Sequence, residues 1–369
     1  MKSQGAVLWE VGKDWSIEEI EVGDPQAHEV LVELRAAGLC HSDEHLVTGD
    51  TFVDLPMIGG HEGSGVVLAV GEGVTRVAPG DHVAFSFIPS CGQCRWCVSG
   101  HSNLCDLGAH LLGGGSIADG TYRTTVGGQP VNRFCQVGAF SRHTCVHEAS
   151  VVKVDPDLPL PVVALVSCGV VTGWGSAVNT AEVGAGDTVV VAGCGGIGLN
   201  AIQGARRAGA RHVIAVDPVP FKREAAERFG ATHTVASIAE ARALVRDLTH
   251  GEMAESAILT TGVAEGDLLS PMVGLVGKTG IVVVTAIAPM LQMEVSLSLG
   301  ELTLFQKQVR GSIFGGSNPK VAIPHLLALY RDGLIELDGL ITRTYALEDV
   351  NQGYADLRDG KNLRGVLTF

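Results

Sequence analysis

The sequence predicts a two-domain α/β protein, in which a parallel sheet covered by helices on both faces is joined to an irregular, β-rich domain. Three observations support this prediction. The 369-residue chain is about two to three times the usual length of one domain. A β-branched run leads into a glycine-rich turn and a helical pattern near residue 193. Short apolar segments broken by glycine and proline precede that run, which is typical of a separate β-rich region.

Composition and charge exclude several classes of protein. Hydrophobic residues make up 46% of the chain and charged residues 18%, so it can bury large cores and is not a disordered protein. The formal net charge is −14, and a nucleic acid would bind against that field. The first ten residues contain no apolar signal core, and the longest apolar stretches, such as 162–171, fall short of the ~18 residues of a membrane span. We therefore expect a cytoplasmic protein with neither a nucleic-acid nor a membrane partner.

Four of the nine cysteines form a compact cluster. The spacing is C-x2-C-x2-C-x7-C, in a lobe from about residue 88 to 108, and its members are Cys91, Cys94, Cys97 and Cys105. Four thiolates close a tetrahedron around zinc and leave no position for substrate, so the spacing predicts a structural zinc site. An iron–sulfur centre is the alternative metal assignment. A nucleic-acid-binding zinc ribbon is disfavoured by the acidic balance of the chain.

A second set of metal-binding residue types is spread along the chain. Cys40 lies among histidines and carboxylates, His61 and Glu62 lie in a glycine-rich stretch, and Cys168 follows an apolar run. Each of these residues alone is more typical of an inert core cysteine or of a hydrogen-bonded histidine. Two cysteines and one histidine with a free fourth position are the ligand set of a catalytic zinc. The sequence by itself does not show that Cys40, His61 and Cys168 meet.

Residues 187–208 predict a nucleotide-binding turn. A strand over 187–192 leads into Gly193–Gly198, which reads G-x-G-x-x-G, and residues 199–208 predict the following helix. Glycines there let a pyrophosphate approach the N-terminus of the helix. The next strand, 212–216, ends at Asp217, which can accept both ribose hydroxyls and would repel a 2′-phosphate, so NAD is favoured over NADP. The alternative interpretation of Asp217 is the N-cap of a helix that begins near Pro220.

The segments after Asp217 continue the same alternation. Residues 221–229 predict a helix, and residues 257–261 and 281–285 predict strands. This alternation is typical of a doubly wound Rossmann sheet. We expect the Rossmann domain to span residues 170–312 and the β-rich domain to span residues 1–169 and 313–369.

Taken together, these motifs resemble one known family. Its signature spacing is matched by Gly60-His61-Glu62, Gly65, Gly71 and Val74, and the four-cysteine lobe and the Gly193–Gly198 turn accompany it. Over essentially its whole length the chain resembles the zinc-containing medium-chain alcohol dehydrogenases. The resemblance implies a GroES-like catalytic domain, a Rossmann coenzyme domain, NAD, and two zinc ions per chain, one catalytic and one structural. Residues 57–62, 87–97 and 305–316 are most similar to actinobacterial nicotinoprotein alcohol dehydrogenases, which hold NAD tightly and use nitrosoaniline dyes as artificial acceptors.

The resemblance implies a role for individual residues. Cys40, His61 and Cys168 match the catalytic-zinc ligands. Glu62 matches an acid near the metal, and Asp43 matches the acid that orients His61. Ser42 and His45 match a proton relay. The positions that match coenzyme contacts are His41, Thr172, Gly193, Gly195, Gly196, Ile197, Gly198, Asp217, Lys222, Ile287, Ser312, Phe314 and Arg364. The positions that match the substrate pocket are Phe87, Phe134, Cys135 and Pro289.

The activity implied by the resemblance is the reversible oxidation of primary or aromatic alcohols to aldehydes by hydride transfer to NAD, with an external acceptor able to recycle tightly bound NAD. A thiol-dependent formaldehyde dehydrogenase of the same architecture is one alternative, and a catalytically idle binding or structural protein on this fold is another. Residues 309–314 match an edge strand that pairs across a two-fold axis, so we expect a homodimer or homotetramer. An ordinary buried strand of one subunit is the alternative for this segment.

Overall fold

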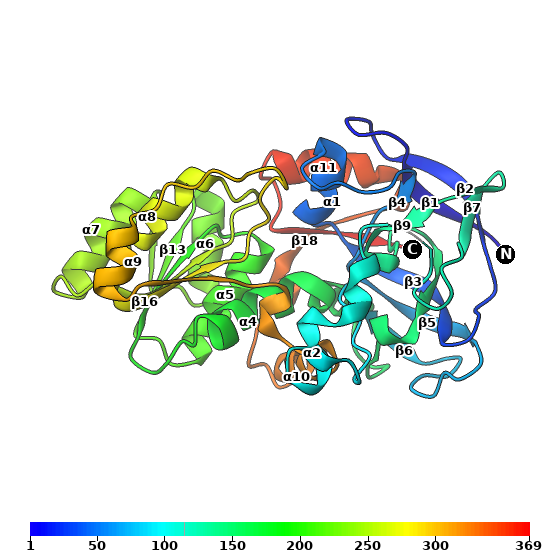
Figure 1. The fold of residues 1–369 in the computed structure, drawn as a ribbon, viewed down its shortest axis with the longest axis horizontal. Helices are drawn as coiled ribbons and strands as arrows, with labels where there is room; N and C mark the ends of the chain where they lie inside the picture. Colours follow the sequence, from blue (N-terminus) through cyan, green and yellow to red (C-terminus); the bar gives the residue numbers. More distant parts are fainter. Residues whose placement is uncertain (114) are drawn as a thin grey trace. The chain divides into compact units, whose positions relative to one another are not determined.

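The structure, a computed structural model, describes residues 1–113 and 115–369. The chain forms two compact units. The first comprises Met1–Cys168 and Asn318–Phe369, so both termini belong to it, and the second comprises Gly169–Ser317 (Figure 1).

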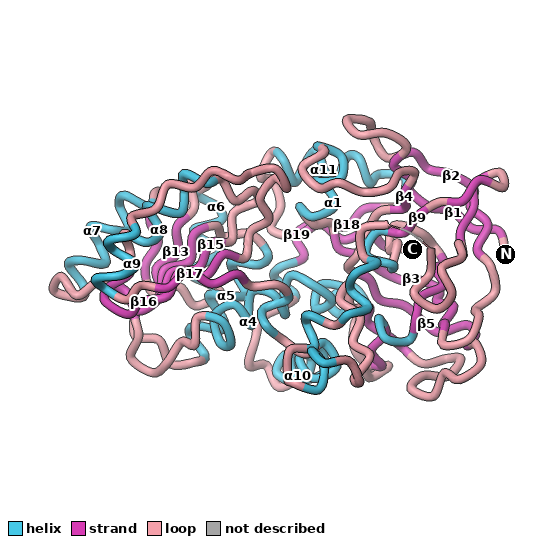
Figure 2. The backbone as a smooth tube through the Cα atoms, in the orientation of Figure 1, coloured by secondary structure: helices cyan, strands magenta, loops and turns pink. Residues whose placement is uncertain are grey.

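Two sheets form the framework of the first unit (Figure 2). Its strands are β1 (Lys2–Leu8), β2 (Ser16–Val22), β3 (Glu29–Gly38), β4 (Met57–Ile58), β5 (Gly63–Val70), β6 (His82–Phe85), β7 (Thr124–Val126), β8 (Gln129–Pro130), β9 (Asn132–Arg133), β10 (His143–His147), β11 (Val151–Lys153), β18 (Ile341–Tyr345) and β19 (Arg364–Thr368). One sheet has the order β8-β7-β2-β1-β4-β9. The other has the order β11-β6-β5-β3-β19-β18, with β10 also paired to β3.

Strand β3 is the centre of this unit because it pairs with β5, β10 and β19. Its alternating residues Val30, Val32 and Leu34 are fully buried in the main core. The unit's helices are α1 (His41–Thr48), α2 (Arg95–Val98), α3 (Leu160–Leu165), α10 (Pro319–Arg331) and α11 (Val350–Arg358). Helix α1 begins three residues after β3 ends, so the central strand fixes the position of its first turn.

A parallel sheet with the order β14-β13-β12-β15-β16-β17 forms the second unit. Its strands are β12 (Thr188–Ala192), β13 (His212–Val216), β14 (His233–Val235), β15 (Ala254–Leu259), β16 (Val276–Val284) and β17 (Gln308–Gly311). Its helices are α4 (Val171–Gly175), α5 (Gly196–Arg207), α6 (Pro220–Arg228), α7 (Ile238–Leu248), α8 (Leu269–Val273) and α9 (Leu299–Phe305). Every residue of β12 is buried, and because alternate side chains point to opposite faces, both faces of the sheet are covered.

This architecture confirms the predicted α/β fold class with a doubly wound parallel sheet. The strand order reverses at β12, which is the switch point where such sheets bind nucleotides. Strand β13 has the predicted bounds, whereas α5 begins at Gly196, three residues earlier than predicted. The earlier start has a simple cause: the last glycines of the motif belong to the first helical turn.

One expectation about apolar segments was wrong. Residues 160–180 form a helical run of 21 residues that is long and apolar enough, by length and composition, to cross a membrane. The apolar stretch named in the sequence analysis, 162–171, is only part of this run, which continues through the polar residues Thr172, Ser176 and Asn179. In its most apolar 18-residue window 83% of the run is buried inside the protein, and α3 packs on β3 and β5 while α4 packs on α5. It therefore serves as a core helix.

The first turn of the parallel sheet requires close packing at Gly198. A Cβ atom there would collide with the carbonyl oxygen of Gly193, whereas a Cβ atom on Gly195 would meet nothing within 4 Å. We predict that Gly198→Ala lowers the stability of the protein by about 1–3 kcal/mol, because a backbone oxygen has no room to move. Gly195→Ala, the matched control, should leave the melting temperature nearly unchanged. Thermal unfolding by circular dichroism measures both, and equal melting temperatures would contradict the prediction.

Candidate functional site

Four potential metal ligands lie in three separate segments of the first unit. Cys40 immediately precedes α1, and His61 and Glu62 lie between β4 and β5. Cys168 belongs to a π-helical turn, Val166–Val170, which directly follows α3. Such turns often occur at functional sites because they rotate one side chain out of the regular helical row.

Side-chain hydrogen bonds fasten the Cys168 segment to β5. Ser64 Oγ donates to the carbonyl oxygen of Leu160 at 2.6 Å. Ser167 Oγ donates to the carbonyl oxygen of Gly63 at 3.0 Å. Both serines are completely buried, so these bonds satisfy polar groups that water does not reach. The bonds hold Cys168 next to the strand that follows His61 and Glu62.

The structure brings Cys40, His61, Glu62 and Cys168 together. One potential ligand atom from each of the four residues lies within 4.8 Å of all the others. The four residues are between 0% and 7% exposed. Sequence analysis could not show that Cys40, His61 and Cys168 meet, and the tertiary structure places them side by side.

The imidazole of His61 has the environment of a metal ligand. Its Nδ1 lies 3.0 Å from Oδ2 of Asp43, which is fully buried and accepts the Gly60 N–H through Oδ1 at 2.7 Å. Both ring nitrogens are buried, and neither has a hydrogen bond of regular geometry in the described part of the chain, so Asp43 contacts Nδ1 as an ion pair and Nε2 has no such contact with a carboxylate. A carboxylate on one ring nitrogen and a bare second nitrogen are typical of a zinc-binding histidine. The donor set of two sulfurs and one such nitrogen therefore fits zinc.

Buried charges perturb the ligands strongly. A hydrogen bond from the Cys168 thiol lowers the pKa of Cys40 and raises the pKa of Cys168. Burial lowers the pKa of His61, but the negative charges of Asp43 and Cys40 outweigh it and raise that pKa well above its ordinary value. A proton and a metal ion would thus compete for the same electron pairs, as expected where metal binding displaces protons.

Glu62 is neutralised in part by Arg364, which enters from β19. Burial raises the pKa of Glu62 to about 7, although the charge of Arg364 opposes this rise. The guanidinium contacts Glu62 through Nη2, which also lies 3.1 Å from the carbonyl oxygen of Leu39. Arg364 is 5% exposed, and it is one of the positions that match coenzyme contacts. In the structure it contacts Glu62, the acid beside the potential metal ligands.

Two aromatic rings flank His61. The ring centroids of Phe87 and Phe134 lie 5.5 Å and 5.4 Å from the imidazole, both edge to face. Cys135 is 5% exposed, and burial raises its pKa to about 12, so it is a neutral thiol. The structure thus places Phe87, Phe134 and Cys135 in the first unit, and Pro289 lies in the second.

The predicted relay residues lie on α1. Ser42 Oγ is 3.6 Å from Cys40 Sγ, so the hydroxyl adjoins a metal ligand. His45 is 3% exposed, and its Nδ1 lies 3.0 Å from Oδ2 of Asp50. Sequence reasoning missed Asp50. The signal that could have found it is the glycine just before it, because a glycine after a helix reverses the chain and returns the next residue to the last turn.

The predicted pyrophosphate turn lies at the start of α5. Its cap residue is Gly195, and among the described residues no side chain caps this helix. The first N–H groups of α5 therefore face no capping side chain, and the open space above Gly195 fits the approach of a pyrophosphate. Asp217 follows β13 and accepts N–H groups from Cys194 at 2.8 Å and from Val219 at 2.9 Å. Val219, and not Asp217, is the N-cap of α6.

The remaining coenzyme positions divide between the two units. Ser176 joins Thr172 and Ser312, because its hydroxyl lies 2.7 Å from the carbonyl oxygen of Thr172 and 3.1 Å from the hydroxyl of Ser312. Phe314 is 1% exposed, whereas Ile287 is 40% exposed. The positions in the second unit are Thr172, Gly193, Gly195, Gly196, Ile197, Gly198, Asp217, Lys222, Ile287, Ser312 and Phe314. His41 and Arg364 belong to the first unit.

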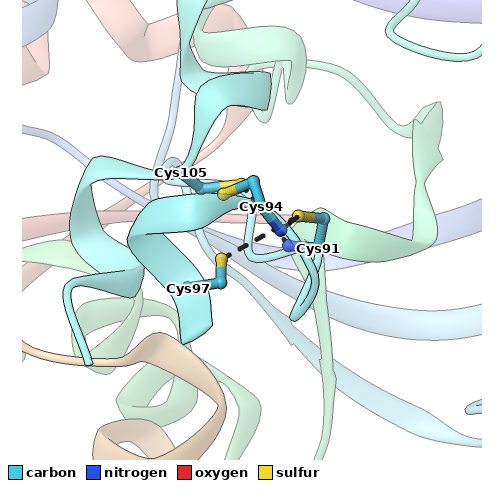
Figure 3. A group of neighbouring side chains, drawn as sticks. All are labelled: Cys91, Cys94, Cys97 and Cys105. Carbon is cyan, nitrogen blue, oxygen red and sulfur yellow. Dashed lines mark hydrogen bonds between the residues drawn. The ribbon is translucent and has the colours of Figure 1, made fainter. Parts of the chain in front are cut away.

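The four clustered cysteines form a separate site around α2 (Figure 3). The sulfur atoms of Cys91 and Cys97 are 3.9 Å apart, as are those of Cys94 and Cys105. A tetrahedral zinc with Zn–S bonds of ~2.3 Å has sulfur–sulfur edges of about 3.8 Å, so the cluster fits a single ion. The backbone N–H groups of Asp106 and Cys97 lower the pKa of Cys94 to about 6, which favours the thiolate that binds zinc.

Two family models match the chain. Residues 26–157 match the alcohol dehydrogenase GroES-like domain, and residues 196–329 match the zinc-binding dehydrogenase domain. The NDMA-dependent alcohol dehydrogenase of Amycolatopsis methanolica is 52% identical over 367 residues, which cover 100% of this chain and 99% of that protein. Alcohol dehydrogenase B of Mycobacterium tuberculosis is 49% identical over 370 residues, with 100% and 99% coverage.

Solved structures agree with these matches. The benzyl alcohol dehydrogenase of Acinetobacter calcoaceticus superposes with a TM-score of 0.93 at 31% identity, covering 100% of this chain and 99% of that one. A zinc-binding alcohol dehydrogenase protein of Burkholderia ambifaria gives the same TM-score at 33% identity, with the same coverage. The GroES-like and Rossmann architecture and the zinc inferred from the sequence are therefore confirmed. The chain belongs to the zinc-containing medium-chain alcohol dehydrogenase family and resembles its NDMA-dependent members.

Proposed function

We propose that this protein is a nicotinoprotein alcohol dehydrogenase, which oxidises primary or aromatic alcohols with NAD that stays bound and is recycled by an external acceptor. The convergence of Cys40, His61 and Cys168 beside an aromatic wall carries the proposal. The full-length similarity to an NDMA-dependent enzyme supports the recycling of resident NAD. In this proposal the first unit is the catalytic domain and the second is the coenzyme domain.

The ligand residues would hold zinc in an open site. Cys40, His61 and Cys168 supply two sulfurs and one nitrogen, which leaves a fourth position for the substrate oxygen. Asp43 holds the imidazole of His61 in a fixed orientation, and Arg364 restrains the carboxylate of Glu62. When bound, zinc supplies a Lewis acid that acidifies an alcohol, and NAD supplies the hydride acceptor.

Other residues orient the alcohol and remove its proton. Phe87 and Phe134 stand edge to face against His61, so they present apolar surface to the side chain of an alcohol and exclude water from that side. Ser42 adjoins the ligand Cys40, and its hydroxyl would pass a proton through the nicotinamide ribose to His45, which lies on the same helix. The Gly193–Gly198 turn and Asp217 would bind the pyrophosphate and the ribose of NAD.

The zinc assignment makes a direct prediction for Cys168. Cys168→Ser replaces a thiolate with a weak hydroxyl ligand of nearly the same size, so turnover should fall more than about 100-fold and zinc content should drop from two ions toward one per chain. The fold should persist. Cys145→Ser is the matched control, because Cys145 is also buried but lies outside both cysteine sites. Elemental analysis and alcohol oxidation measure the effect, and full activity in Cys168→Ser would contradict the ligand role.

The proposal that NAD stays bound to the protein is tested by denaturing the protein and measuring the NAD that is released. We expect purified protein, once denatured, to yield close to one NAD and two zinc ions per chain. The native protein should oxidise an aromatic alcohol with a nitrosoaniline dye and no added NAD. Activity that depends entirely on added NAD would remove the nicotinoprotein proposal while keeping the alcohol dehydrogenase. Oxidation of formaldehyde only in the presence of a low-molecular-weight thiol would favour the formaldehyde dehydrogenase alternative.

We also propose that the protein works in the cytoplasm as a homodimer or homotetramer. Strand β17 lies at the edge of its sheet and is mostly exposed, as expected of an edge strand and not of a buried one. Exposed apolar side chains precede it, lie on it and follow it. They include Leu291, Met293, Leu299, Leu304, Phe305, Val309 and Ile313. An apolar region next to a free strand edge favours pairing with a second copy.

A charge on the strand edge should prevent this pairing. We predict that Val309→Lys converts the oligomer to a smaller species, because a lysine on an edge strand blocks edge-to-edge association. Val321→Lys is the control: Val321 is 65% exposed on α10, outside this region. Light scattering after size-exclusion chromatography gives the mass of each variant. An unchanged mass for Val309→Lys would exclude β17 as the interface.

A further inference from the structure

The end of α1 carries an acid that the proposed function has not used. Helix α1 stops at Gly49, whose φ of 81° lies in the left-handed region that favours glycine. The reversed chain is held by the Thr51 N–H, which donates to the carbonyl oxygen of His45 at 3.1 Å. Because Asp50 lies between Gly49 and Thr51, this turn brings its carboxylate back onto the side chain of His45.

The contact between Asp50 and His45 is well defined. Oδ2 of Asp50 lies 3.0 Å from Nδ1 of His45 and also accepts the hydroxyl of Thr48 at 2.6 Å. The side chain of His45 is 3% exposed and that of Asp50 is 28% exposed, so the pair has a buried base and a partly hydrated acid. Hydrogen bonds from Thr48 and His45 lower the pKa of Asp50. The carboxylate is therefore ionised at neutral pH and can only accept hydrogen bonds.

A hydrogen-bond acceptor beside Nδ1 determines which tautomer the neutral imidazole of His45 adopts. A neutral histidine carries one ring proton, and its position is set by the hydrogen bond that the ring makes. Opposite a carboxylate the proton stays on Nδ1, and Nε2 keeps its lone pair. A triad acid fixes its histidine in the same way in serine hydrolases.

We propose that Asp50 is a positioning residue of the proton relay, which holds His45 in the Nδ1–H tautomer so that Nε2 accepts the proton that the relay carries away from the alcohol. The alcohol loses one proton, Ser42 passes one on as it receives that one, and Nε2 takes up one while Nδ1, 3.0 Å from the Asp50 carboxylate, keeps its own. No electrons are exchanged in this step. The inference rests on the proposed function, because it requires His45 to take part in alcohol oxidation.

The test compares Asp50→Asn with wild type, both with NAD bound. An amide can donate to Nδ1 and so favours the Nε2–H tautomer. The ring-nitrogen chemical shifts of His45, identified by their loss in His45→Ala, report the tautomer without any turnover. The burst of reduced nicotinamide after mixing with alcohol reports a single hydride transfer. Glu44→Gln is the matched control. It removes a carboxylate from α1, the helix that carries His45, but at a residue that is paired with Arg358.

We expect Asp50→Asn to shift the proton to Nε2 and to slow the burst about 10-fold or more, with little change in KM. Glu44→Gln should change neither. Asp50→Glu keeps the acceptor, so it should restore the Nδ1–H tautomer and most of the rate.

Three outcomes would overturn the inference: a wild-type burst in Asp50→Asn, a slow burst with the Nδ1–H tautomer retained, or a slow Asp50→Glu with that tautomer restored. His45→Ala separates these failures from failure of the relay. If His45→Ala is slow and Asp50→Asn is not, only the role of Asp50 is lost. If His45→Ala reacts at the wild-type rate, the relay and the role of Asp50 are both wrong.

Discussion

Burial of two thiols and two carboxylates in one cluster is the constraint on which the rest of this structure depends. Cys40, Glu62 and Cys168 are each no more than 7% exposed, and the carboxylate of Asp43 is fully buried beside them. An unpaired buried anion costs several kcal/mol, and several together repel one another. A divalent cation among donor atoms that lie within 4.8 Å of each other removes both penalties. A metal ion would thus supply the positive charge that the side chains of the site do not provide in full.

The surrounding polypeptide is arranged to satisfy the same constraint. The last strand, β19, pairs with β3 and delivers Arg364 to Glu62, so the C-terminal segment completes a site begun by the first forty residues. Asp43 receives the Gly60 N–H and faces His61, and the serines at 64 and 167 fasten the helical segment that carries Cys168. The packing of the first unit therefore brings the ligand residues together.

The two metal sites show how differently a site can be encoded. The ligands of the four-cysteine site are close in sequence, and their sulfur atoms lie near one another around one short helix. Spacing alone predicted that site because a short loop limits how far apart its cysteines can lie. The ligands of the catalytic site are separated by up to 128 residues, from Cys40 to Cys168, so no local geometry restrains them. They meet only because β3, β5 and α3 pack together.

The sequence by itself determined the fold class, the glycine-rich turn, the four-cysteine cluster and the family, because each depends on residue type at short spacing or on similarity along the whole chain. Only the tertiary structure decided that the residues at 40, 61, 62 and 168 converge, that Arg364 contacts Glu62, and that Asp50 contacts His45. It also revealed that the apolar stretch at 162–171 belongs to a longer, mostly buried helical run over 160–180. These features arise from strand pairing and chain reversal, and such contacts depend on the packing of the whole unit and not on neighbouring residues.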